Sequence, residues 1–408
     1  MPIYSPVIIY TFICCNLLLS GLGVKYTYLG AALFFFLVLL LIDNKQKTTP
    51  PNCIVNHIFI LFLIIHGIIS FYYEGVESLR NPLLFIWPIA FWNVYFSKRS
   101  QMPNRVLKHY FYIAGTIALA GIIQYFYSDS LFGLIPSVEQ VPPNTLNTLN
   151  TAPGPPRLSY FRTSSITGSP QIYGTIVFLS GVLFRETSPK TIFNKIFFLF
   201  LVSASLFSGN KLVILLICIY SVYVLRYNRK LIPIFLGVLL AIIIINISPL
   251  QKPLKTIRLS RLILVKEAIF QEKRDSRIDR YKAVIQDTPF LTGKGAGYYD
   301  VNKLYNYPSI ESQFFKFYAE YGAIGMLLFQ AMFLLPLWKT FASNNPIWIV
   351  IFLSYIAGWA VQLIESPFFF YFWGIIIHAQ RTHSLYPKVR THSNYTTESG
   401  NHPIFNSR

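Results

Sequence analysis

The chain has 408 residues; 53% of them are hydrophobic, 12% are charged, and the formal net charge is +19. About a quarter of the residues of a soluble domain are charged, so this composition excludes an ordinary soluble protein and predicts a polytopic α-helical membrane protein. The positive charge does not indicate nucleic-acid binding, because most basic residues lie in loops between apolar segments, where they orient membrane proteins. The four cysteines show no metal-ligand spacing, so no metal is expected.

Apolar segments long enough to cross a bilayer recur along the whole chain. About twelve membrane spans are predicted, and the first is expected to be a retained helix and not a cleaved signal peptide. The expected fold is therefore an all-α, polytopic bundle of transmembrane helices, with spans near residues 6–22, 26–42, 54–73, 80–96, 109–127, 168–185, 192–207, 212–226, 231–248, 313–337, 346–364 and 365–379.

Basic residues decide the predicted orientation, because loops rich in Lys and Arg stay in the cytoplasm. Segments 97–109 and 226–230 carry such clusters, which places both chain termini inside and leaves two long loops outside. The chain accordingly divides into N-terminal transmembrane helices (1–127), a first long external loop (128–167), central transmembrane helices (168–248), a large basic external loop (249–312), C-terminal transmembrane helices (313–379) and a basic cytoplasmic tail (380–408).

The external loop 249–312 contains twelve Lys and Arg residues against seven acids. Outer loops are normally poor in basic residues, so this loop predicts an anionic ligand at the outer face, and a lipid-linked phosphate or diphosphate fits best. Leu259, Leu262 and Ile269 recur at helical spacing among the basic residues, which predicts an amphipathic helix lying on the bilayer surface. The first external loop is rich in proline and is predicted to be extended.

The same basic loop carries Arg277, Arg280 and Tyr281, which share one face if the segment is helical. Two guanidinium groups on one face can grip phosphate oxygens through forked, charge-assisted hydrogen bonds. The alternative is a solvated face on which these arginines pair with Asp275 and Asp279.

Two further cations stand where polar segments meet apolar spans. Arg162 lies where an outer loop re-enters the membrane, just before Gly168 and Pro170, and an arginine at this depth requires a partner. Lys211 ends the short turn 208–211; a functional role and simple snorkelling to the interface are equally open for it.

Two acids are candidates on the span that begins at residue 313. Glu311 stands at its outer mouth, where a carboxylate could accept a proton from a sugar hydroxyl; it could equally cap the helix. Glu320 lies deeper and is expected to pair with Lys316, four residues earlier, in a structural role. The segment Gly293–Gly297 is not expected to be a phosphate loop, because it lacks the Walker A spacing and a complete GxGxxG.

Taken in order, these segments resemble the O-antigen polymerase and ligase superfamily of bacterial surface-polysaccharide assembly. The similarity covers about residues 160–330, and before residue 160 it rests on hydropathy alone. Lys211 stands where the family pattern has an arginine. The matching elements are Arg162 with Gly168 and Pro170, the turn Ser208–Lys211, the stretch Arg277-Ile-Asp-Arg-Tyr281-Lys-Ala-Val284 with Gly293–Gly297, Glu311-Ser312, and Glu320-Tyr-Gly322-Ala-Ile-Gly325.

The resemblance implies a cofactor-free, metal-independent glycosyltransferase of the bacterial inner membrane that uses undecaprenyl-diphosphate-linked oligosaccharides. It implies that Arg162 and Arg277 hold the diphosphate, with Arg280 and Lys211 in support, and that Glu311 activates the acceptor hydroxyl with inversion. Tyr281 and Glu320 are further candidate site residues. Besides the lipid-linked substrate, the expected partners are membrane lipids, a chain-length regulator and a flippase, and no nucleic acid.

Ligases of this superfamily typically have histidine where this chain has Glu311, which favours a polymerase. The alternatives are an O-antigen ligase, a flippase of lipid-linked sugars and a scaffold subunit of an assembly complex. A flippase is disfavoured, because the spans are almost free of charge and the polar groups gather at one face. Whether the product is O-antigen, capsule or exopolysaccharide stays open.

Overall fold

A computed structural model of the chain describes residues 53–74, 104–127, 170–227, 277–296, 298, 312–361, 369, 372–376 and 379. This part of the chain consists of α-helices joined by turns and contains no strand, so the predicted all-α class is confirmed for it. The helices are α3 (Cys53–Glu74), α5 (Asn104–Tyr127), α7 (Pro170–Thr187), α8 (Ile192–Leu206), α9 (Lys211–Tyr227), α14 (Arg277–Asp287), α16 (Gln313–Ala342) and α17 (Trp348–Ala360).

All of these helices except α14 fall on predicted membrane spans. Among the described residues, α16 is the one helix that is long and apolar enough to cross a membrane, and shorter apolar helical stretches are Ile58–Tyr72, Ile192–Leu206 and Trp348–Ala360. The structure therefore shows helices and one candidate span; the arrangement of twelve spans stays a prediction. Its spans outside the described residues are 6–22, 26–42, 80–96 and 231–248, and the span 365–379 is described only in part.

Polar side chains set the beginnings of several helices. The Thr191 side chain accepts a hydrogen bond from the backbone N–H of Asn194 at the start of α8, and Ser312 does the same for Phe315 in α16. In the turn before α9, Gly209 has a positive φ of 61°, and Asn210 Oδ1 accepts from the backbone N–H of Leu212 at 3.0 Å. Each cap satisfies a backbone donor that the first helical turn leaves without a partner.

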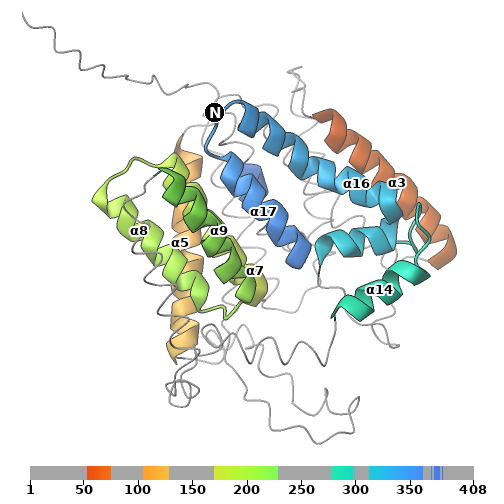
Figure 1. Cartoon of the computed structure of the whole chain (residues 1–408), viewed down its shortest axis with the longest axis horizontal. Helices are drawn as coiled ribbons and strands as arrows, with labels where there is room; N and C mark the ends of the chain where they lie inside the picture. Colours follow the sequence, from red (N-terminus) through yellow and green to blue (C-terminus); the bar gives the residue numbers. More distant parts are fainter. Residues whose placement is uncertain are drawn as a thin grey trace, which may run out of the picture.

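The described helices form two groups that meet at α17. On one side α7 packs against α5, α8 and α9, and on the other α3 and α14 pack against α16, while α17 contacts α7, α9 and α16 (Figure 1). Aromatic rings contribute to the α3–α16 contact: the ring of Phe59 lies 5.9 Å from that of Phe317, which itself stacks on Phe329 of the same helix with centroids 4.2 Å apart. Such ring pairs add stability beyond the apolar area that they bury.

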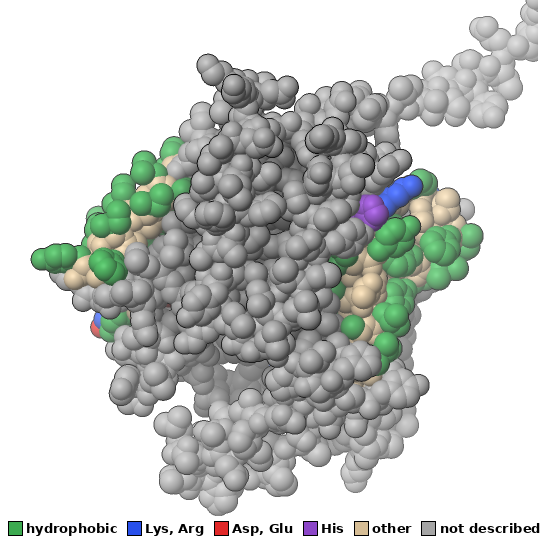
Figure 2. Space-filling view, turned by 180° about the vertical axis from the view of Figure 1, so that it is seen from behind, with side chains coloured by type: hydrophobic (Ala, Val, Ile, Leu, Met, Phe, Trp, Pro, Cys, Tyr) green, Lys and Arg blue, Asp and Glu red, His purple; other side chains and the backbone are tan. Residues whose placement is uncertain are grey.

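Large apolar side chains also point outward from the bundle. Figure 2 shows hydrophobic side chains gathered at both flanks of the molecule, over α3 on one side and over α5 and α8 on the other. Exposed apolar surface of this extent is typical of proteins that contact a membrane or another protein. The exposed residues on α3 and α8 are Ile58, Leu61, Ile64, Ile65, Ile68, Ile69, Phe71, Tyr72, Ile192, Phe193, Ile196 and Leu199.

One feature of α16 corrects the predicted continuous span 313–337. Gly322 has φ 68° and ψ −169°, which is not a helical conformation, and the helix breaks there. Figure 1 shows α16 as two segments that meet at an angle, and the non-helical residue between them is Gly322. In membrane proteins an irregular backbone is tolerated only where protein or a cavity surrounds it, so the break marks a region with local packing partners.

Candidate functional site

Helix α14, which begins at Arg277, lies along the first half of α16. The ring of Tyr281 stacks on Phe315 with centroids 4.5 Å apart and planes within 4°. One turn further along, Val284 packs against Ala319, and both are buried. Because residues 281 and 284 meet residues 315 and 319 in the same order, the two helices run parallel and begin at the same end of the site.

The helical conformation of Arg277–Asp287 places positions 277, 280 and 281 on one face. Tyr281 and Val284 show that this face is the one that contacts α16. The positions of both arginines therefore belong to the side of α14 that faces the start of α16, although their side chains are outside the described part.

The loop that follows α14 fills the break in α16. The backbone N–H of Lys294 donates to the carbonyl of Ala319 at 2.9 Å, and that of Gly295 donates to the carbonyl of Glu320 at 3.0 Å. From the other half, the N–H of Ala323 donates to the carbonyl of Phe290 at 2.7 Å. These are the helix-end groups that a break would leave without hydrogen bonds, so the loop replaces the missing helical bonds.

Two glycines make this contact possible, and we call Gly293 and Gly322 the glycine interlock. Both have positive φ, 71° and 68°. A Cβ atom on Gly293 would overlap the carbonyl of Glu320, and one on Gly322 would overlap the carbonyl of Leu291. The two glycine-containing segments that the sequence analysis singled out are therefore complementary halves of one backbone contact.

The loop does not offer its backbone amides to a phosphate. The N–H of Gly293 donates to the carbonyl of Pro289 at 3.0 Å, and the N–H of Ala296 donates to Ser70 Oγ at 3.0 Å. Together with the bonds of Lys294 and Gly295, these occupy the amides of residues 293–296. The geometry supports the exclusion of a phosphate loop: the glycines serve close backbone packing.

Helix α3 holds the same loop from the opposite side through two residues that sequence reasoning missed. His66 Nε2 donates to the carbonyl of Thr292 at 2.9 Å, since a carbonyl oxygen can only accept. Its Nδ1 lies 3.4 Å from Ser70 Oγ, which accepts from Ala296, and its ring stands edge-on to Tyr321 at 4.9 Å. Two polar residues four apart in an otherwise apolar span were the signal that could have identified them.

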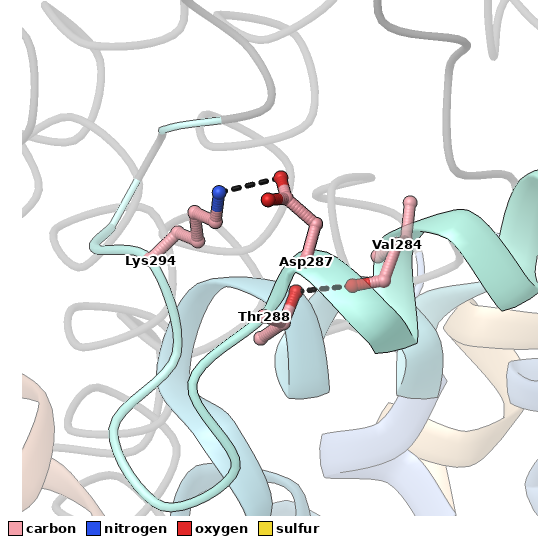
Figure 3. Close-up of polar contacts among 4 residues, drawn as sticks. All are labelled: Val284, Asp287, Thr288 and Lys294. Carbon is pink, nitrogen blue, oxygen red and sulfur yellow. Dashed lines mark hydrogen bonds and ion pairs between the residues drawn. The ribbon is translucent and has the colours of Figure 1, made fainter.

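The end of α14 is tied to the loop by an ion pair. Lys294 Nζ lies 2.5 Å from Asp287 Oδ2, and the Thr288 hydroxyl donates to the carbonyl of Val284 at 2.6 Å (Figure 3). The same ammonium group is 5.2 Å from the centre of the Tyr298 ring. These contacts close the last turn of α14 and set the direction in which the chain enters the loop.

A buried polar stripe runs along the first half of α16. Lys316 Nζ and Glu320 Oε1 are 3.9 Å apart, and their side chains are 2% and 1% exposed. The expected pairing of these two residues is confirmed. Gln313, one helical turn before Lys316, is also buried. Burying a charged group costs free energy unless an opposite charge lies close to it. The buried pair therefore supports a structural role for Glu320 in the first half of α16.

The remaining candidates are not brought to this place by described contacts. Lys211 is the exposed first residue of α9, which packs on α7, α8 and α17, whereas α14 packs on α16. Arg162 and Glu311 lie outside the described residues. In the part of the chain that the structure describes, no group of three His, Cys, Asp or Glu residues could hold a metal ion. The chain matches no model of a known protein family, and a search of curated proteins found no match to its sequence.

Proposed function

We propose that this protein is a membrane-embedded polymerase of bacterial surface polysaccharide. It joins undecaprenyl-diphosphate-linked repeat units at the outer face of the inner membrane. The observation that carries the proposal is the parallel packing of α14 on the first half of α16, through Tyr281 on Phe315 and Val284 on Ala319. This packing brings the arginine-bearing start of α14 to the end where α16 begins, at Gln313, two residues after Glu311 in the sequence.

The proposed membrane arrangement has twelve spans with both termini in the cytoplasm. The exposed apolar flanks of the bundle support an apolar surrounding. The contact of His66 and Ser70 with the loop 292–296 is consistent with the predicted topology, in which the end of α3 and this loop lie on the same side of the membrane. The site then lies at the outer mouth of the bundle.

In the proposed reaction, the hydroxyl oxygen of the incoming unit attacks the anomeric carbon of the growing chain. Glu311 takes the hydroxyl proton, the bond from the anomeric carbon to the diphosphate oxygen breaks, and undecaprenyl diphosphate leaves with the electron pair. Attack opposite the leaving group inverts the anomeric centre. Arg162 and Arg277, supported by Arg280, stabilise the negative charge of the departing diphosphate.

The test is complementation of a strain that lacks the gene. Arg277→Ala and Glu311→Ala are expected to abolish polymer, while Lys282→Ala, which removes an exposed cation from the same helix, should leave the polymer near normal. Saccharides on the lipid carrier and at the cell surface are then sized by gel electrophoresis. Near-normal polymer from either Arg277→Ala or Glu311→Ala would remove that residue from the mechanism.

The deletion strain itself separates the alternatives. Single repeat units without any ladder support the polymerase. Polymer stranded on the carrier would indicate a ligase, and units trapped at the cytoplasmic face would indicate a flippase; either result overturns the proposal.

A further inference from the structure

The turn that follows α14 forms an exposed apolar tip, which consists of Phe290 and Leu291. The side chains of these two residues are 67% and 57% exposed. Leaving large apolar side chains in water is unfavourable, and burying them against apolar groups is favourable. Two large apolar residues at the apex of a turn are therefore expected to have an apolar neighbour that covers them.

On one side, the tip continues into the exposed surface of α16. The hydrogen bond from Ala323 to the carbonyl of Phe290 holds the tip at the start of the second half of that helix. The next outward-facing residues there are Ile324 and Leu327, and both are exposed. The tip thus stands at the head of an apolar stripe on the helix with the strongest membrane-spanning character.

On the other side, the tip lies level with an exposed apolar stretch of α3. The bond between His66 and Thr292 sets this level. The exposed apolar residues on α3 at and beyond this point are Ile65, Ile68, Ile69, Phe71 and Tyr72. From His66, α3 continues to Glu74, about 12 Å further along its axis at 1.5 Å per residue. The tip is consequently placed below the outer end of α3 and between two apolar surfaces.

We propose that Phe290 and Leu291 insert into the acyl-chain region of the outer leaflet and anchor α14 at the membrane surface. The partner is the phospholipid bilayer. Ile285, exposed on α14 next to the tip, extends the apolar contact.

This anchor extends the proposed function, and its consequence for the choice of substrate rests on that function. The diphosphate of a lipid-linked sugar lies at headgroup level, because its polyprenyl chain is held in the hydrocarbon. A tip fixed among the acyl chains would hold α14, and the arginine positions at its start, at a constant depth relative to that diphosphate. The anchor thereby selects a substrate that is itself embedded in the bilayer.

The test measures the depth of the tip directly. Nitroxide labels are attached to Phe290→Cys and Leu291→Cys in full-length protein whose native Cys14, Cys15, Cys53 and Cys218 are replaced by serine. The protein is reconstituted in vesicles of phosphatidylethanolamine and phosphatidylglycerol. Gln286→Cys, an exposed polar position on α14, is the aqueous control, and Leu327→Cys is the lipid-facing reference.

Collision rates with oxygen and with a water-soluble nickel complex are read by power-saturation spectroscopy. Labels at residues 290 and 291 are expected to show the same collision rates as the label at residue 327. Their collision rate with the nickel complex should be several-fold lower than that of the label at residue 286. Nickel accessibility equal to that at Gln286 would overturn the anchor, and so would low accessibility to both reagents, which indicates burial by protein.

This readout does not depend on catalysis. If Arg277→Ala leaves polymer formation normal, the glycosyltransferase proposal loses that residue while the collision data still support or overturn the anchor. Water-exposed labels at residues 290 and 291 would overturn the anchor whatever the polymer yield. Failure of the anchor and failure of the proposed function are therefore distinguishable.

Discussion

The conformations of Gly293 and Gly322 leave no room for a side chain. Both residues have positive φ, and each faces a backbone carbonyl of the other segment. Gly322→Ala is expected to lower the free energy of unfolding by at least about 2 kcal/mol, because left-handed strain and overlap with Leu291 add. Thermal unfolding in detergent measures this loss. Gly181→Ala is the matched control, since Gly181 has no positive φ and a Cβ there would make a tight 3.3 Å contact with Leu201 Cβ, without the backbone overlap found at Gly322. An equal loss in both variants would contradict the interlock.

The buried pair of Lys316 and Glu320 leads to a second expectation at the residue scale. Lys316→Met leaves the Glu320 carboxylate without the cation that lies 3.9 Å from it, at an expected cost of about 3–5 kcal/mol. The double variant Lys316→Met/Glu320→Gln removes both charges and should recover most of that loss. A double-mutant cycle of thermal stabilities measures the coupling. Simple additivity of the two single losses would show that the charges do not interact.

At the scale of elements, the stack of Tyr281 on Phe315 holds α14 in register with α16. Tyr281→Ala should cost about 0.5–1.5 kcal/mol beyond the lost area and should lower polymer yield, because the arginine positions lose their alignment. Tyr281→Phe keeps the ring and is expected to retain most polymer. Ladder intensity, normalised to the amount of folded protein in the membrane, compares the variants. If Tyr281→Phe lowered polymer yield as much as Tyr281→Ala, the hydroxyl group and not the ring would hold α14 in register.

The break in α16 is also an element-scale property, because one loop supplies hydrogen bonds to both halves of the helix. Residues Lys294 and Gly295 bond to the end of the first half, and Phe290 bonds to the start of the second. Helix α3 then fixes the loop through His66 and Ser70. Three elements thus hold the broken helix in one geometry, which gives α14 a fixed support.

At the scale of the whole molecule, the predicted topology places the end of α14 outside the cell membrane and the end of α9 in the cytoplasm. A membrane-impermeant reagent should therefore reach the first and not the second. In the cysteine-free background, Gln286→Cys should react with a membrane-impermeant maleimide added to spheroplasts. Arg226→Cys, near the end of α9, should react only after permeabilisation, because basic loops stay in the cytoplasm. Both positions are exposed, so burial does not confound the comparison. Labelling of Arg226→Cys in sealed spheroplasts would reverse or refute the topology.

The sequence by itself determined features that depend on neighbours along the chain. The predicted spans 192–207 and 212–226 correspond to α8 and α9, because a continuous apolar run satisfies its own backbone only as a helix. The pairing of Lys316 with Glu320 followed from helical spacing alone. Helical spacing also placed positions 277, 280 and 281 on one face of what is now seen to be α14.

Only the tertiary structure decided how these pieces meet. The break at Gly322 depends on hydrogen bonds from a loop about 30 residues earlier, and the loop is held by His66 and Ser70, each 226 residues from its partner. Contacts between such distant segments leave no periodic mark in a sequence. The parallel register of α14 and α16, on which the proposed site depends, is likewise fixed by ring stacking across space, because hydropathy and spacing report each helix separately and not the surface that it will meet.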